Sequence, residues 1–166
     1  MTKKYIILYL ILSVLFRFYL VTSHNVIERP DGVNYITTGK NLLNGTGYIN
    51  LSNNYELQKT PFYPILIGLA SLFITDTEFA GRLVSIIFGA LLIIPVFLLG
   101  KRFYGETAGH IAAILVIFYP ILSHYSILVM TESTYTFIFL LSILLGWSCI
   151  STEKTVYHHI LIGILF

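Results

Sequence analysis

The chain has 166 residues, of which 56% are hydrophobic and only 11% are charged, and its formal net charge is +2. A soluble globular domain carries roughly 25% charged residues, so this chain cannot cover a water-facing surface of ordinary size. The composition excludes a soluble domain, a disordered chain and a nucleic-acid-binding protein with a basic face. The single cysteine, Cys149, excludes a disulfide framework or a cysteine-based metal site. We predict an integral membrane protein of the all-α class, a polytopic transmembrane helical bundle.

Four apolar runs approach the roughly 20 residues that a transmembrane helix needs. They cover about 5–21, 79–100, 107–122 and 131–150, and another run starts at 157 and stops ten residues later. Ten helical residues rise only about 15 Å, half the thickness of the hydrocarbon core. We therefore interpret 1–166 as the amino-terminal part of a longer transmembrane domain, or else as the product of a gene cut short.

The first apolar run also resembles a signal peptide. Two lysines precede it, and Val21-Thr22-Ser23 is loosely similar to a cleavage site. Arg17 inside the run, and the further apolar runs after it, argue against cleavage. We expect a first helix that is retained.

The apolar run 61–74 is short for a span, and the positive charges help to place it. If this run lies in the outer interface or re-enters it, the basic pair at 101–102 falls on the same side of the membrane as the pair at 3–4. If the run crosses, the pair at 101–102 moves outside, against the preference of Lys and Arg for cytoplasmic loops. The rule favours a short interfacial or re-entrant helix, which puts the loop 22–60 and Glu132 on one outer face.

The outer loop 22–60 is the only sizeable hydrophilic segment, so any external chemistry must draw on it. Pro30 and Asp31 are typical of a helix start, and a loose apolar stripe after them predicts a short amphipathic juxtamembrane helix. Asp31 and Tyr35 would lie one turn apart on one face of it. Asp31 is either a functional carboxylate or an ordinary first-turn acid that complements the helix dipole.

Glu132 follows Thr131 at the outer start of the fourth run. An ionisable residue beside a span is a functional hypothesis, whereas the ordinary alternative is a helix start capped by Thr131. Asp31 and Glu132 could hold a divalent cation or share general-base work if the fold brings them together. The sequence identifies no cofactor beyond this candidate cation, and its histidines do not form a metal site.

Three cations accompany these carboxylates on the outer side. They are Arg17 and Arg82, near the outer ends of the first two spans, and Lys59 before the 61–74 run. Long cationic side chains readily extend to the lipid headgroups, which is the ordinary interpretation. The functional alternative is a site for a lipid-linked phosphate, where cations offset the charge of the leaving group.

Several short segments occur in an order that resembles a known family. The segments are Arg17, Asp31-Gly32 with Tyr35, Leu42–Tyr48, Lys59–Pro64, Gly81–Ser85, Lys101–Gly105, Tyr119-Pro120 and Thr131-Glu132. This order is similar to the amino-terminal portion of GT-C membrane glycosyltransferases. It most resembles glycosyltransferase family 39 and its relatives, which include the protein O-mannosyltransferases and the aminoarabinose transferases of lipid A.

The resemblance implies that a hexose or pentose moves from a polyprenyl-phosphate carrier to a hydroxyl on protein, lipid or polysaccharide, at the extracytoplasmic face of the cell membrane. It makes Asp31 the candidate general base and Glu132 a second catalytic carboxylate. Tyr35 would line the same cavity. Lys59, and less directly Arg82, would bind the carrier phosphate.

The chain departs from this family in two respects. Many members carry an Asp-Glu pair where this chain has Asp31-Gly32, which points to a different subgroup. Members normally also have many more spans. The alternative is a non-catalytic multi-span protein or half of a transporter. Transporters place ionisable residues near the bilayer midplane, whereas here the charges gather at the ends of the spans, which favours an interfacial site.

Overall fold

The computed structural model describes residues 2–23 and 29–151, and within them the regular secondary structure is helical apart from one isolated β-bridge, between Ile49 and Tyr55. The helices are α1 (Thr2–Ser23), α2 (Pro30–Leu43), α3 (Phe62–Ser71), α4 (Thr77–Leu91), α5 (Ile93–Tyr104), α6 (Glu106–Phe118), α7 (Pro120–Tyr125) and α8 (Glu132–Ser151). The all-α class is therefore confirmed. The run predicted from 157 lies outside the described residues.

Two described helices are long and apolar enough to cross a membrane, namely Lys4–Ser23 and the 28 residues Thr77–Tyr104. The second comprises α4 and α5, which are separated only by a turn at Leu92. Pro95 explains the turn, because proline lacks an N–H and its ring displaces the carbonyl four residues earlier. The number of membrane crossings stays a prediction.

The predicted run 107–122 is divided in the structure. Helix α6 ends at Phe118, Tyr119 is extended with ψ 116°, and α7 starts at Pro120. A residue before proline is driven out of the helical region by the proline ring, so the break is local in origin. The 13 residues of α6 rise only about 20 Å, less than the hydrocarbon core.

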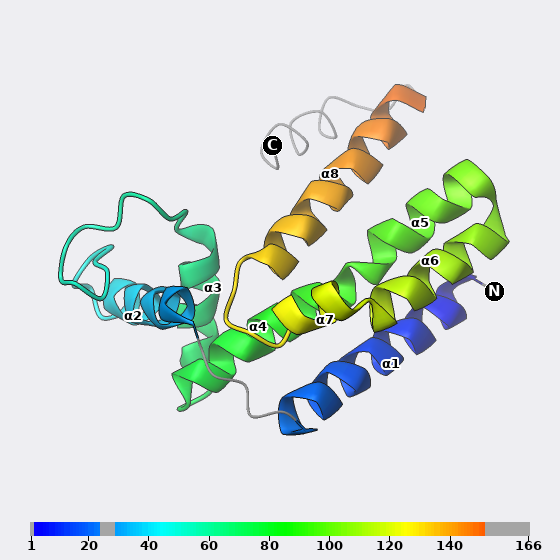
Figure 1. Ribbon diagram of the computed structural model, residues 1–166. Coiled ribbons are helices and arrows are strands. Elements are labelled where there is room, and N and C mark those ends of the chain that lie inside the picture. The colour runs from blue at the N-terminus through cyan, green and yellow to red at the C-terminus, as the bar shows by residue number, and fades with distance from the viewer. Residues whose placement is uncertain (1, 24–28, 152–166) are drawn as a thin grey trace.

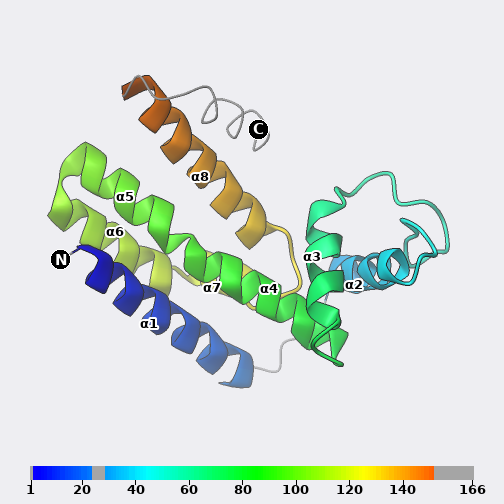
Figure 2. The same cartoon turned by 180° about the vertical axis from the view of Figure 1, so that it is seen from behind.

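The helices form two parts (Figures 1 and 2). Helices α1, α4, α5 and α6 run side by side, α8 packs against α4 and α5, and α2 with α3 forms a lobe at the amino-terminal end of α4. A core at the α5–α6 contact holds the bundle together and includes Ile93, Phe97 and Ile117. The start of α8 lies at the lobe end of the bundle, and the α5–α6 turn lies at the opposite end.

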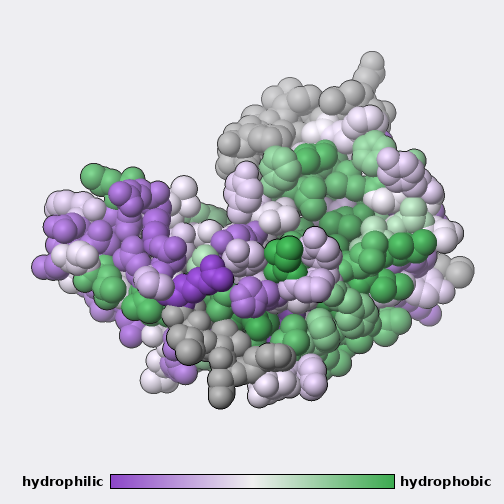
Figure 3. Space-filling model, viewed as in Figure 1, coloured by the Kyte–Doolittle hydropathy of each residue, from purple (hydrophilic) through white to green (hydrophobic). Residues whose placement is uncertain are grey.

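The surface is divided in the same way. Figure 3 shows hydrophobic side chains over the bundle and hydrophilic ones gathered over the lobe. Helix α1 alone exposes Ile7, Leu8, Ile11 and Leu15 by more than half of their surface. Water-soluble monomers rarely expose an apolar patch of this extent, so this face suits contact with lipid.

Helix α3 occupies most of the short run 61–74. Its 10 residues rise about 15 Å, too little to cross a bilayer alone, and it packs against α2 and α4 instead of joining the bundle. The α2–α3 contact is close because two glycines meet there. A Cβ on Gly39 would lie 2.5 Å from the carbonyl oxygen of Pro64, and a Cβ on Gly68 would lie 2.9 Å from the carbonyl oxygen of Gly39.

We expect Gly39→Ala to destabilise the lobe by about 1–3 kcal/mol, because backbone atoms must move apart to admit the methyl group. The measurement is thermal unfolding of the purified protein in detergent, with Gly146→Ala as the control. Gly146 lies on α8 with nothing within 4 Å of the added Cβ. Equal unfolding temperatures for the two variants would contradict the close α2–α3 packing.

Candidate functional site

The first turn of α2 presents the predicted carboxylate. Pro30 occupies the first turn, where its fixed φ suits a helix start and its missing N–H costs nothing. Asp31 follows, and its Oδ1 accepts a hydrogen bond from Nζ of Lys59 at 2.6 Å. The Asp31 side chain remains 62% exposed, whereas that of Lys59 is only 17% exposed. The carboxylate is thus paired and still open to solvent.

Lys59 also contacts Tyr35, one turn along the same helix. Its Nζ lies 4.3 Å from the centroid of the Tyr35 ring, within the range of a cation–π interaction. Three of the residues predicted from sequence therefore lie together, and we name Asp31, Tyr35 and Lys59 the α2 cluster. The grouping of Asp31 with Tyr35 follows from helical spacing, but the arrival of Lys59 from 28 residues away does not.

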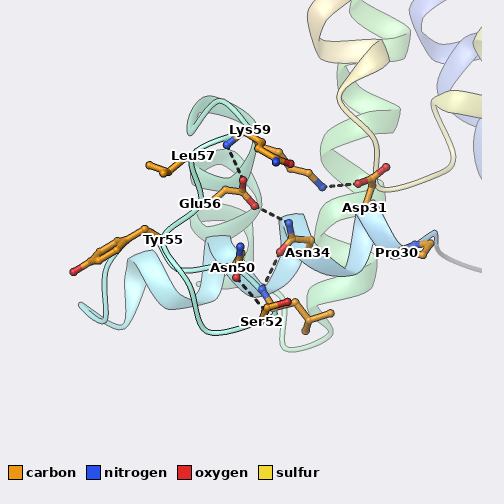
Figure 4. A pocket seen from close by; sticks show the side chains of 11 residues that line it. Pro30, Asp31, Asn34, Asn50, Ser52, Tyr55, Glu56, Leu57 and Lys59 are labelled. Carbon is orange, nitrogen blue, oxygen red and sulfur yellow. Dashed lines mark hydrogen bonds and ion pairs between the residues drawn. The ribbon is translucent and has the colours of Figure 1, made fainter.

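The backbone of Lys59 is held by the loop that leads to it (Figure 4). Its carbonyl oxygen accepts a hydrogen bond of 2.9 Å from the hydroxyl of Tyr48, and the N–H of the residue before it, Gln58, donates to the carboxylate of Glu56 at 2.9 Å. Glu56 is buried, and it also accepts from Nδ2 of Asn34 at 2.8 Å. Sequence reasoning missed Glu56, because nothing in a polar loop marks one acid as buried.

These hydrogen bonds fix the protonation states in the loop. The N–H of Gln58, the amide of Asn34 and the nearby Lys59 hold the pKa of Glu56 below its usual range, and they outweigh the opposing effect of burial. Burial, followed by the Glu56 charge, raises the pKa of Tyr48. At neutral pH Glu56 is therefore an acceptor and Tyr48 a donor, as their contacts with Gln58 and Lys59 require.

Two cavities meet at Lys59. A groove of about 690 Å³ lies between the lobe and α8. The groove is lined by Tyr35, Gln58, Lys59, Thr60, Phe62, Tyr63, Thr131, Thr134, Tyr135 and Ile138. A second cavity, of about 430 Å³, is lined by Pro30, Asp31 and Asn34 of α2 and by loop residues from Asn50 to Lys59 (Figure 4). Lys59 borders both cavities, and Asp31 borders only the second.

The start of α8 faces the α2 cluster across the groove, but Glu132 itself does not line the groove. Its Oε2 is buried and has no hydrogen-bonding partner among the described residues, and the same holds for Oγ1 of Thr134. The structure thus places residues close to Glu132 in sequence, Thr131 and Thr134, on the groove that Tyr35 and Lys59 also line. It does not place the two predicted carboxylates in contact.

A chain of side chains connects the cluster with the α8 start. The rings of Tyr35 and Tyr63 meet edge to face at 5.3 Å, and the Tyr63 hydroxyl lies 2.6 Å from Oγ of Ser85. Ser85 in turn donates to the carbonyl oxygen of Met130 at 3.3 Å. Helices α2, α3 and α4 therefore support one wall of the groove and fix its distance from the other.

The two predicted arginines lie elsewhere. Arg82 forms an ion pair of 2.5 Å with Glu78 one turn earlier on α4, and it lines neither cavity. Arg17 is fully buried and donates to Oγ of Ser126 at 2.7 Å and to Ser13. This burial contradicts the interpretation in which Arg17 extends to the headgroups, and Arg17 lines neither cavity. Of the three cations, only Lys59 reaches the two cavities.

No group of three or more His, Cys, Asp or Glu side chains suited to a metal ion occurs within residues 2–23 and 29–151. Neither Asp31 nor Glu132 belongs to such a group in that part of the chain. The divalent cation considered from the sequence stays a prediction.

Long apolar helices in the bundle and a charged cluster in the lobe beside it are features of an integral membrane protein with one polar end. A model of the dolichyl-phosphate-mannose-protein mannosyltransferase family matches residues 58–166, which is 109 of the 166 residues. The chain belongs to this family of GT-C integral membrane glycosyltransferases, and the resemblance predicted from the sequence is confirmed. The match includes Lys59, Arg82 and Glu132 and begins after Asp31 and Tyr35. No curated protein and no solved structure matches the chain.

Proposed function

We propose that the α2 cluster is the site at which mannose passes from a polyprenyl phosphate to an acceptor hydroxyl on the extracytoplasmic face of the membrane. The observation that carries this proposal is the position of the Asp31–Lys59 pair. The pair stands between a groove with a mainly apolar and aromatic lining and a cavity with a polar lining. In this arrangement a lipid-linked donor binds in the apolar groove, and a water-soluble acceptor enters the polar cavity.

Lys59 is the residue suited to the phosphate. It is the one basic side chain among the described residues that line the groove, and the rings and apolar side chains around it suit a polyprenyl chain. A fixed cation beside the phosphate stabilises the negative charge that grows on it as the glycosidic bond breaks. Because the leaving group is already an anionic phosphate, the reaction needs no strong general acid.

Asp31 is the residue suited to the acceptor. Its exposed carboxylate borders the polar cavity and lies within reach of a hydroxyl entering there. In the proposed step the hydroxyl oxygen attacks the anomeric carbon, its proton passes to Asp31, and the bond from that carbon to the phosphate oxygen breaks. The products are the mannosylated acceptor and the free polyprenyl phosphate, and the attack from the opposite side inverts the anomeric centre.

The membrane face follows from the charges at the two ends of the bundle. Lys101 and Arg102 lie at the carboxyl end of α5, opposite the lobe. Basic residues favour the cytoplasmic side, so the lobe with its site is assigned to the other side. The predicted acceptor is a hydroxyl on protein, lipid or polysaccharide, and protein is the acceptor that the family description gives.

The donor class is tested with the purified protein in detergent, supplied with tritiated dolichyl phosphate mannose or with tritiated GDP-mannose. We expect tritium to appear in the acceptor only when the lipid-linked donor carries the label. Excess unlabelled GDP-mannose should not reduce the transfer of label from that donor. Transfer from GDP-mannose alone would overturn the proposal, because the groove would then have no lipid carrier to bind.

A further inference from the structure

Glu56 occupies an unusual position for an acid outside the bundle. It is only 7% exposed, and its carboxylate accepts hydrogen bonds from two N–H groups, Nδ2 of Asn34 and the backbone N–H of Gln58. A buried carboxylate is costly unless it is hydrogen-bonded, and here each of the two carboxylate oxygens accepts a hydrogen bond. Asn34 is part of α2, whereas Gln58 belongs to the loop that leads to Lys59. Glu56 therefore joins this loop to the helix.

Asn34 secures the loop at two points. Its Nδ2 donates to Glu56, and its Oδ1 accepts from the N–H of Leu51 at 2.9 Å. One side chain on α2 therefore holds the loop at Leu51 and again at Glu56. Tyr48 adds a third point, since its hydroxyl donates to the Lys59 carbonyl. Glu56 and Tyr48 thus hold the backbone just before and just after the Lys59 side chain, at the Gln58 N–H and at the Lys59 carbonyl, and we name them the Lys59 clamp.

The clamp determines where the Lys59 side chain starts. A lysine side chain has four flexible bonds, so its ammonium group reaches one place reliably only if the backbone is fixed. Here the ammonium group reaches both Asp31 and the Tyr35 ring. Without the clamp, the loop would let Lys59 leave the border between the two cavities.

We propose that Glu56 and Tyr48 are positioning residues that set the affinity of Lys59 for the phosphate of the lipid-linked donor. This inference rests on the proposed function, in which Lys59 binds that phosphate. In it neither clamp residue contacts the donor, because Tyr48 lines neither cavity and Glu56 lines only the polar one. Both act through the backbone at Gln58 and Lys59, and donor affinity should respond more strongly than the rate of the bound complex.

The experiment measures the Kd of tritiated dolichyl phosphate mannose for the purified protein, together with kcat. In Glu56→Gln an NH2 group replaces one acceptor oxygen, so two donors meet, at Nδ2 of Asn34 or at the N–H of Gln58. In Asn34→Asp two carboxylates meet. We expect each single variant to weaken donor binding about 10-fold, the factor of one charge-assisted hydrogen bond, while kcat changes less than threefold.

The double variant Asn34→Asp with Glu56→Gln restores a donor facing an acceptor, with the charge moved to the other partner. We expect it to regain donor binding to within about threefold of the natural protein. A double variant as weak as the single variants would overturn the proposal. Tyr48→Phe is measured beside them, and unchanged donor binding in Tyr48→Phe and Glu56→Gln would also overturn it.

The control for a general loosening of the loop is Asn41→Ala. Asn41 holds the same loop through a bond of 2.9 Å to the carbonyl oxygen of Ile49, away from Lys59. We expect its donor Kd to stay within twofold, and an equal loss would reduce the clamp to ordinary loop stability. Lys59→Ala separates the two proposals. If it binds donor normally, the role of Lys59 fails, and if only it weakens binding, the clamp alone fails.

Discussion

Replacing Asp31 with asparagine is expected to lower mannosyl transfer by about 10²–10⁴-fold, the range that a positioned general base contributes. Asparagine preserves the size of the side chain and can still accept a hydrogen bond from Lys59. It cannot take the proton of the acceptor hydroxyl. Donor binding should change little, because the phosphate is assigned to Lys59 and not to Asp31.

The measurement is kcat with saturating dolichyl phosphate mannose, together with the donor Kd. The matched control is Glu106→Gln, since Glu106 also forms an exposed ion pair with a lysine, at 3.1 Å from Lys101, but at the opposite end of the bundle. We expect this control to transfer mannose normally. Full activity in Asp31→Asn would remove Asp31 from the mechanism, and an inactive Glu132→Gln beside it would move the base to α8.

The sequence predicted those features that depend on local spacing. Pro30 followed by Asp31 marked the start of α2 correctly, and helical periodicity put Asp31 and Tyr35 on one face. The break between α6 and α7 falls at Tyr119-Pro120, within the run that the sequence predicted as one span. A run of apolar residues indicates hydrophobicity, but the backbone limit imposed by proline decides whether it forms one helix.

Contacts between distant segments were beyond such reasoning. Lys59 meets Asp31 because α3 crosses α2 at two glycines and the loop folds back over α2, and no local pattern encodes that crossing. The burial of Arg17 likewise depends on a contact between distant segments. Whether an arginine near a helix end reaches the headgroups or turns inward depends on its neighbours, and here Ser126 of a distant segment offers a buried acceptor.

Replacing Lys59 with alanine is expected to lower kcat/KM for dolichyl phosphate mannose by about 10²–10³-fold, the loss seen when one fixed donor to a developing anion is removed. The variant loses the cation that would contact the phosphate. It also leaves Asp31 without its ion-pair partner, so that the carboxylate repels the incoming phosphate. Both effects act on the donor, and the loss should therefore appear in the donor Kd as well as in the rate.

Lys101→Ala is the matched control for this variant, because it removes a lysine from an ion pair at the other end of the molecule and should leave donor binding unchanged. Lys59→Arg separates charge from shape. It retains the cation but replaces a compact ammonium with a planar fork, so we expect partial recovery of donor binding. Normal donor binding by Lys59→Ala would mean that the phosphate is held elsewhere. The candidate would then be Arg82, which lines neither cavity and whose ion pair with Glu78 would have to open to admit the phosphate.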